Sequence, residues 1–496
     1  MTAEHFIATV AIVGLVIAVS TLLSGAIDRS GVPSAAVFLM LGLMLGPHGL
    51  AVLDVGLDAP MLRAVTTLSL ALVLFTDALG LDLAEIRRHV GLAVRLLGPG
   101  TLTTAAVAAV AAWWLLDLEP AAAALLGAAL ASTDPVVLRG IVRRPDLPDS
   151  ARVALRLESG LNDAVLLPIV LAAMSLMATS APAWGRLAID VLLLGPVIGI
   201  VVGVVAVSVL SAVRRRTGIR RDYESLYSLG VAFTTFAAAE SVHGSGFLAA
   251  FAAGLTILAL DVELCDCFLE YGETTAEMAL MFAFVLFGTS ALWSGLDQLD
   301  GRTVLFAAIV LAARPLIYLV ALAGSGMGRT PRLVVAWYGP RGLSSLLLVS
   351  LPVFAGLPGA ERMLQLCGVV VIASLLVHGG SLVVLTRRTG KAAARAAPAG
   401  TPQPSAPAPA SRATEAALTE PEPAPHSTGE AITIDELRRL LATGEPVVIG
   451  DARKERGARS SELAAAGSVR IDPARAVVDA RALAIPETSH VALYCA

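Results

Sequence analysis

Long apolar stretches are the feature that most constrains this chain. They recur from Phe6 to Leu385 and are separated by short charged or Gly/Pro-marked loops. Each is long enough to cross about 30 Å of hydrocarbon as a helix, and we expect about thirteen spans within residues 1–390. The sequence is 56% hydrophobic, more than a soluble core requires. These features predict an all-α polytopic membrane protein.

Arginines mark one set of loops. They are Arg87 and Arg88, Arg143 and Arg144, Arg214 to Arg216 with Arg220 and Arg221, and Arg387 and Arg388. By the count of spans these loops share one side, which the positive-inside rule makes cytoplasmic. We therefore expect a multi-pass protein of the bacterial inner membrane, with the N-terminus outside and the C-terminal domain in the cytoplasm. The start of Phe6–Ala26 carries no basic segment, so this stretch is interpreted as a span and not a signal peptide.

Acidic motifs inside two neighbouring apolar stretches need a functional explanation. The motifs are Ser132-Thr133-Asp134-Pro135 and Glu158-Ser159-Gly160-Leu161-Asn162-Asp163. A carboxylate at the bilayer centre costs roughly 2.5 to 3.5 kcal/mol on insertion scales, so each acid needs a partner or an ion. We interpret the two motifs as an ion-exchange site.

The first motif is predicted to break its helix. Pro135 lacks an N–H and clashes with the carbonyl four residues earlier, so the span from about Ala121 to Val142 should unwind near residues 131–133. Carbonyl oxygens left free by this break would suit a cation. The alternative is a simple proline kink capped by Thr133 and Asp134.

The second motif places Ser159 and Asp163 on one helix face, because they are four residues apart, as are Glu158 and Asn162. Asp163, Ser159 and the Thr133 carbonyl could supply the oxygen ligands that a hard monovalent cation needs. Burial disfavours a charged carboxylate, so a proton can compete with the cation for Asp163. Exchange through this single acid would be electroneutral, since Asn162 adds no charge.

Glu158 is interpreted as half of a structural ion pair, because an unpaired buried carboxylate is costly. Arg314 and Arg341 both qualify as its partner, unless they lie at helix ends and extend to the interface. Arg341 belongs to Gly339-Pro340-Arg341-Gly342, a second break in a late span. Paired broken helices are typical of inverted-repeat transporters, with the binding site near the bilayer midplane.

These motifs, in this order, make Phe6–Arg388 resemble the electroneutral sodium/proton exchanger branch of the monovalent cation/proton antiporters. The resemblance implies about thirteen helices in two inverted repeats, crossing broken helices, a homodimer and elevator-type movement of an ion-carrying core. Gly160 and Pro340 depart from the commonest family pattern. These departures bear on local geometry and ion preference rather than on the exchange reaction.

The resemblance also assigns roles to individual residues. Asp163 would be the shared proton and cation carrier, and Glu158 would pair with Arg314. The remaining positions would be ligands or close neighbours of the ion, with Asp77 the loosest match: Asn162, Ser159, Thr133, Asp134 and Asp77. The only metal implied is Na⁺ or another monovalent cation, as cargo, and no cofactor is expected.

The composition changes after residue 390. Residues 391–429 are rich in Ala, Pro, Ser and Thr, which is typical of a flexible linker. Residues 430–496 are predicted to form a small α/β domain, with a helix over Ile434–Leu441 and strands over Val447–Gly450 and Val491–Tyr494.

This C-terminal part resembles the start of a rhodanese-like domain through Asp451, Arg453 and Cys495. Cys495 would be the persulfide-bearing residue. A reactive thiolate needs an electropositive setting, which the loop after the cysteine provides in that fold. We expect the domain to be truncated here and sulfur transfer by this chain to be absent.

The leading hypothesis is a transporter, not an enzyme, that exchanges Na⁺, K⁺ or Li⁺ for H⁺ and serves pH homeostasis. Its partners would be these ions, the lipid bilayer and a second copy of the chain, with no nucleic acid. A cation channel could use similar groups but needs no carboxylate that alternates between proton and cation. A membrane-anchored sulfurtransferase or redox-sensing protein would leave the intramembrane acids unexplained.

Overall fold

The computed structural model describes residues 34–47, 60–134, 147–178, 189–217, 221–260, 262–289 and 299–396, short pieces of residues 437–494, and single residues elsewhere. The chain divides into two compact units, residues 1–390 and 391–496. Each unit is considered by itself. Pro135 and most of the predicted first span, Phe6–Ala26, lie outside the described residues.

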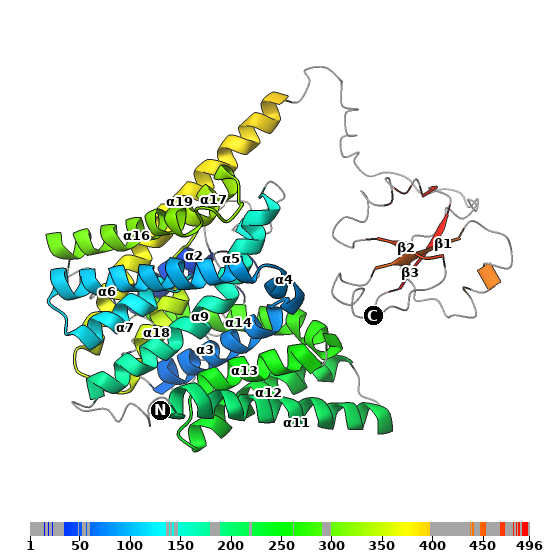
Figure 1. The fold of residues 1–496 in the computed structure, drawn as a ribbon, viewed down its shortest axis with the longest axis horizontal. Coiled ribbons are helices and arrows are strands. Elements are labelled where there is room, and N and C mark those ends of the chain that lie inside the picture. Colours follow the sequence, from blue (N-terminus) through cyan, green and yellow to red (C-terminus); the bar gives the residue numbers. More distant parts are fainter. Residues whose placement is uncertain are drawn as a thin grey trace, which may run out of the picture. The chain divides into compact units, whose positions relative to one another are not determined.

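The first unit is a bundle of helices (Figure 1). In chain order the helices, with two π-helical segments labelled η, are α2 (Ser34–Leu45), α3 (Pro60–Gly80), α4 (Leu83–Arg88), α5 (Val90–Arg95), η1 (Leu96–Leu102), α6 (Thr103–Leu116), α7 (Pro120–Ala131), α9 (Asp149–Ala178), η2 (Ile189–Leu194), α11 (Gly195–Arg216), α12 (Arg221–Ser241), α13 (Gly246–Leu260), α14 (Val262–Thr289), α16 (Gly301–Ala321), α17 (Arg329–Trp337), α18 (Leu343–Phe354) and α19 (Ala360–Ala396).

Several helices begin where the sequence supplies a capping group. The Asp300 carboxylate accepts a hydrogen bond from the Thr303 amide at 2.7 Å at the start of α16. This bond holds the pKa of the exposed Asp300 below its ordinary value. Asp82 caps α4 in the same way, and α7 begins at Pro120, where a missing N–H costs nothing.

Six helices in the described part of the chain are long and apolar enough to cross a membrane. They cover Leu62–Gly80, Val90–Leu116, Asp149–Ala178, Leu192–Arg216, Gly301–Ala321 and Ala360–Ser381. Shorter apolar helices, among them α7 and α18, accompany them. The predicted helical, polytopic character is confirmed, while the total of about thirteen spans stays a prediction.

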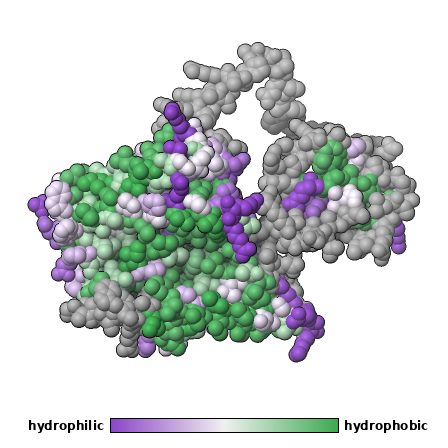
Figure 2. All heavy atoms as spheres, in the orientation of Figure 1, coloured by the Kyte–Doolittle hydropathy of each residue, from purple (hydrophilic) through white to green (hydrophobic). Residues whose placement is uncertain are grey.

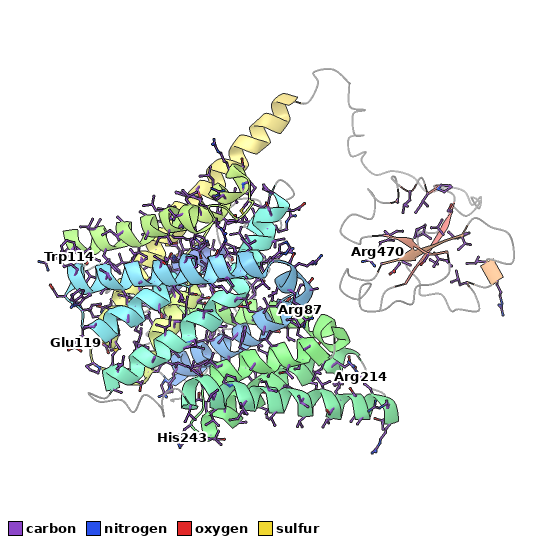
Figure 3. All side chains as sticks on the ribbon, viewed as in Figure 1. Arg87, Trp114, Glu119, Arg214, His243 and Arg470 are labelled. Carbon is purple, nitrogen blue, oxygen red and sulfur yellow. The ribbon has the colours of Figure 1, made fainter. Side chains whose placement is uncertain are left out.

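The surface of this unit fits a lipid environment. Hydrophobic residues cover much of its visible face, and strongly hydrophilic ones gather mainly toward the helix ends (Figure 2). Arg87 and Arg214 lie toward one end of the bundle, and Trp114 and Glu119 lie at the other (Figure 3). Two of the predicted basic loops therefore share an end, and its assignment to the cytoplasm stays a prediction.

Helices α11 and α13 pack against each other through small residues. A Cβ atom placed on Gly199 would lie 2.2 Å from the carbonyl oxygen of Ala249 on α13. Gly199 therefore permits an approach that any side chain would prevent. Such close packing matters in lipid, where helices gain little from hydrophobic burial against one another.

The second unit contains a three-stranded parallel sheet with the order β2-β1-β3. The strands are β1 (Val447–Asp451), β2 (Val469–Arg470) and β3 (His490–Tyr494). Two of them, β1 and β3, match the predicted strands with one more residue each, whereas the short β2 is too brief for a pattern to reveal.

The predicted rhodanese-like residues are only partly visible. Asp451 is buried at the end of β1 and forms an ion pair with Arg470 at 3.4 Å. Arg453 and Cys495 lie outside the described residues. Helix α19 continues to Ala396, beyond the boundary predicted at residue 390, which suits a segment rich in the helix formers alanine, lysine and arginine.

Replacing Gly199 with alanine should lower the melting temperature of the purified protein in detergent, because the added methyl group forces α11 and α13 apart. The matched control is Gly230→Ala on α12, where an added Cβ meets nothing within 4 Å. This control should be neutral or stabilising by up to about 1 kcal/mol, since alanine favours the helix. Equal melting temperatures for the two variants would contradict the packing described here.

Candidate functional site

Two helix breaks lie side by side at the centre of the site. Helix α7 ends at Ala131, and Ser132 to Asp134 are not helical. Residues 338–342 separate α17 from α18 in the same way. The amide of Asp134 donates to the carbonyl of Pro340 at 3.0 Å, so backbone joins one break to the other.

Each break supplies the charge that the other requires. The Asp134 carboxylate accepts a hydrogen bond from the Leu343 amide at 2.8 Å, at the positive N-terminal end of α18. The Arg341 guanidinium donates to the carbonyls of Ala131 at 2.7 Å and Ser132 at 3.1 Å, at the negative C-terminal end of α7. The two charged side chains thus cap each other's helices.

This capping corrects one prediction. The carbonyls of Ala131 and Ser132 are not left free for a cation, because Arg341 binds both. Asp134 likewise caps α18, a helix distant in sequence, rather than a kink in its own helix. Gly342 is what allows the close approach, since a Cβ there would lie 1.9 Å from Asp134 Oδ2.

The neighbouring helix α9 brings Asp163 and Asn162 against the first break. Helix α9 runs without interruption past Gly160, and both side chains are buried. The Ser132 hydroxyl donates to Asp163 Oδ1 at 2.5 Å, and the Asn162 amide donates to the Thr133 hydroxyl at 2.7 Å. Side-chain hydrogen bonds therefore connect the first acidic motif to the second.

Two oxygens of this cluster remain unsatisfied. In the described part of the chain, Asp163 Oδ2 and Asn162 Oδ1 are buried without a hydrogen-bond partner. Buried polar atoms are nearly always paired, so such orphans point to a group that binds there. An acidic and an amide oxygen suit a proton or a hard cation, which prefers oxygen ligands.

Ser344 and Ser345 are residues of the site that the sequence analysis missed. Ser344, at the start of α18, lies close to the Asp163 carboxyl group, and Ser345 donates to the Ser132 carbonyl at 3.5 Å. Their signal was a pair of serines one residue after the Gly-Pro-Arg-Gly break, in the first turn of the next helix, which lies at the crossing point.

Ser159 and Asp77 are the other two predicted ligands. The Ser159 hydroxyl donates to the carbonyl of Arg156 on its own helix at 3.4 Å. Asp77 is half-buried on α3, a helix that contacts both α9 and α18. Their contribution to an ion site stays a prediction.

Glu158 forms a buried ion pair with Arg314 of α16. Both guanidinium nitrogens Nη1 and Nη2 reach the carboxylate, Nη2 at 2.9 Å, and the Tyr318 hydroxyl donates to Glu158 Oε1 at 2.9 Å. Arg314 also donates to the carbonyls of Val335 and Tyr338 at the end of α17. The pair therefore ties α9 and α16 to the second break.

The contacts in the structure decide which of the two arginines is the partner of Glu158. Arg314 pairs with Glu158, whereas Arg341 caps α7. Arg314 is 2% exposed and Arg341 is 1% exposed, so neither extends to the interface. Arg314 donates to Glu158 and to two carbonyls, and Arg341 donates to two carbonyls, which offsets part of the cost of burying each charge.

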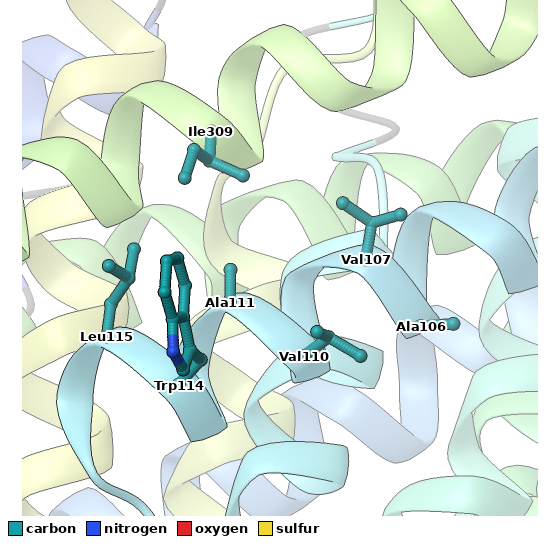
Figure 4. Close-up of a pocket in the computed structure, with 7 residues that line it drawn as sticks. All are labelled: Ala106, Val107, Val110, Ala111, Trp114, Leu115 and Ile309. Carbon is teal, nitrogen blue, oxygen red and sulfur yellow. The ribbon is translucent and has the colours of Figure 1, made fainter.

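An apolar pocket of about 360 Å³ opens between α6 and α16 (Figure 4). Its lining includes Val110, Trp114 and Ile309, and none of the residues predicted for the ion site. Apolar walls offer no ligand for a proton or a cation. This pocket is separate from the candidate site.

Comparison with known proteins agrees with this geometry. Residues 15–388 match the family described as sodium/hydrogen exchanger, transmembrane. The chain belongs to this family. The match includes α7, α9, α16, α17 and α18, the helices that build the candidate site.

Similar members of known function are distant relatives. The K⁺/H⁺ antiporter NhaP2 of Shewanella sp. (strain ANA-3) is 28% identical over 382 residues, which cover 75% of this chain and 65% of that protein. The Na⁺/H⁺ antiporter NhaH of Halobacillus dabanensis is 25% identical over 383 residues, 72% of this chain and 92% of that protein. The chain thus spans slightly less than two thirds of the NhaP2 relative.

A solved structure shares the fold of this exchanger-family chain. The sodium proton antiporter MjNhaP1 from Methanocaldococcus jannaschii superposes with a TM-score of 0.62 at 21% identity, covering 79% of this chain and 99% of MjNhaP1. At this identity the likeness concerns the arrangement of the helices.

Replacing Arg314 with methionine should destabilise the folded protein by about 3 kcal/mol or more, because it leaves Glu158 charged, buried and unpaired. The double variant Glu158→Gln with Arg314→Met should recover part of this loss. Thermal unfolding in detergent measures both.

The control is Arg302→Gln, which removes an exposed ion pair with Asp117 and should cost about 1 kcal/mol or less. The single variant Glu158→Gln completes the comparison. If the stability lost in the double variant equals the sum of the losses in Glu158→Gln and Arg314→Met, the pairing is contradicted.

Proposed function

We propose that this chain is a secondary active antiporter that exchanges a monovalent cation for a proton, with Asp163 as the carrier of both. The observation that carries the proposal is the buried Asp163 carboxylate, held at Oδ1 by Ser132 and unpartnered at Oδ2 beside two crossed helix breaks. Family membership and the antiporter names of the relatives support it.

The chemistry follows from one site with two competing occupants. A buried carboxylate is stable when it is protonated or when a cation neutralises it, and costly when it is empty and charged. The loaded forms can therefore cross and the empty anion cannot. Each cycle then exchanges one positive charge for another, so transport is electroneutral, and the neutral Asn162 adds no charge to it.

The ligand set of the cation is part of the same proposal. Three ligands would lie together at the first break: Asp163, which is bonded to Ser132, and Asn162 and Thr133, which are bonded to each other. The set would be completed, directly or through water, by Asp134, Ser159 and Asp77. Asp134 also caps α18 through Oδ2. Na⁺, K⁺ and Li⁺ all suit such oxygens, and relatives named for K⁺ and for Na⁺ both exist.

Assembly and orientation complete the proposal. The exchanger would sit in a bacterial inner membrane as a homodimer, with the Arg-rich end and residues 391–496 in the cytoplasm. An ion-carrying core that includes α7, α9, α17 and α18 would move by an elevator-type mechanism. The second unit would be a rhodanese-like accessory module, which its parallel sheet and the Asp451–Arg470 pair support.

The decisive test is proton flux in everted vesicles from an antiporter-deficient strain. Adding Na⁺, K⁺ or Li⁺ to acidified vesicles should raise the lumenal pH with the wild type, and the Asp163→Asn variant should lose this response. The ion that elicits the response identifies the substrate.

Asp149→Asn is the matched control, since Asp149 lies on the same helix with a 92% exposed side chain and should leave the flux unchanged. Cation movement without proton flux would indicate a channel. An active Asp163→Asn variant would place the carrier elsewhere.

A further inference from the structure

Helix α19 presents a polar group to the second break that the proposed exchange site does not use. Ser374 and His378 are four residues apart, so they share one helix face, and both are buried. The surrounding segment is otherwise strongly apolar and forms one of the candidate membrane spans. Buried polar side chains in such a segment need a structural or functional reason.

Both side chains bind the backbone on either side of the break. The amide of Arg341 donates to Ser374 Oγ at 2.7 Å. His378 Nε2 lies 3.1 Å from the carbonyl oxygen of Trp337, the last residue of α17. His378 Nδ1 lies 3.1 Å from Ser374 Oγ, which closes the bridge between the two contacts.

Both ring nitrogens of His378 face a carbonyl oxygen, Nε2 that of Trp337 at 3.1 Å and Nδ1 that of Ser374 at 3.0 Å. In the tautomer with its hydrogen on Nε2, the ring donates to the Trp337 carbonyl, because a carbonyl oxygen only accepts. Nδ1 of a neutral ring can then accept the Ser374 hydroxyl hydrogen, while Ser374 Oγ accepts from the Arg341 amide. All three groups are satisfied in one continuous chain of hydrogen bonds.

We propose that Ser374 and His378 form a clamp that positions Arg341 and, through it, the ion-binding carboxylate. The clamp holds the chain at residues 337 and 341, the two sides of the break. Arg341 in turn binds the carbonyl of Ser132, whose hydroxyl binds Asp163. Ser374 and His378 are positioning residues and contact neither Asp163 nor its occupant.

The physical basis is the cost of uncapped backbone in lipid. The Arg341 amide has Ser374 Oγ as its partner, and the Trp337 carbonyl, which accepts from the Gly339 amide at 3.0 Å, has His378 Nε2 as its second. Replacing His378 by leucine removes its donor, and replacing Ser374 by alanine removes the acceptor of the Arg341 amide. Either change allows the break, and with it the Arg341 guanidinium, to shift relative to Ser132.

The role rests on the proposed exchange function, so two readouts are needed. The first is cation-driven proton flux in vesicles. His378→Leu and Ser374→Ala should raise the apparent KM for the cation about tenfold, the loss expected for one buried hydrogen bond, with a smaller change in maximal rate. His378→Gln should restore much of the affinity, because its amide can donate to Trp337.

The control is Ser381→Ala on the same helix. Ser381 accepts a hydrogen bond from the Trp337 side chain at 3.2 Å and does not touch the backbone of the break. Its apparent KM should stay at the wild-type value. A KM unchanged in Ser374→Ala, or equal effects of Ser381→Ala and His378→Leu, would overturn the clamp.

The second readout does not depend on transport. Hydrogen–deuterium exchange over residues 338–343 of the purified protein should be faster in Ser374→Ala than in the wild type. It should also be faster in the two histidine variants, with a larger increase in His378→Leu than in His378→Gln. Exchange in Ser381→Ala should be unchanged. If the wild type shows no proton flux, the exchange function fails and this readout alone decides the clamp. Unchanged exchange in the Ser374→Ala variant would overturn it, even if His378→Leu does not fold.

Discussion

The reciprocal capping of two helix breaks is the interaction on which the rest of the structure depends. Asp134 from the first break caps α18, and Arg341 from the second caps α7. Two helix ends of opposite polarity would otherwise meet inside the membrane without water to solvate them. One pair of opposite charges satisfies both ends and fixes the crossing point beside which Asp163 lies.

The remaining buried charges follow the same logic. Glu158 and Arg314 neutralise each other, and the spare donors of Arg314 bind carbonyls at the end of α17. Asp163 is different, because in the described part of the chain its Oδ2 and the neighbouring Asn162 Oδ1 have no protein partner. An open carboxylate oxygen beside the crossed helix breaks is where an exchangeable ion would bind.

Much of this was predictable from local sequence. Pro135 and the Gly-Pro-Arg-Gly segment indicated where helices break, and the cost of intramembrane acids identified the motifs that matter. Long-range pairing was not predictable in the same way. The residues alone left Arg314 and Arg341 as possible partners of Glu158, and the family resemblance gave the pair with Arg314 that the structure shows. The capping of the Ala131 and Ser132 carbonyls and the contacts of Ser344, Ser374 and His378 depend on which helices lie together, and no local pattern encodes that arrangement.

The central claim is that one carboxylate binds a proton or a cation but not both. Proton release on adding the transported cation to purified, weakly buffered protein tests it most directly. Cation binding to the wild type should release up to about one proton per cation, and the Asp163→Asn variant should release none. Cation binding without proton release, or equal release from the variant, would contradict it.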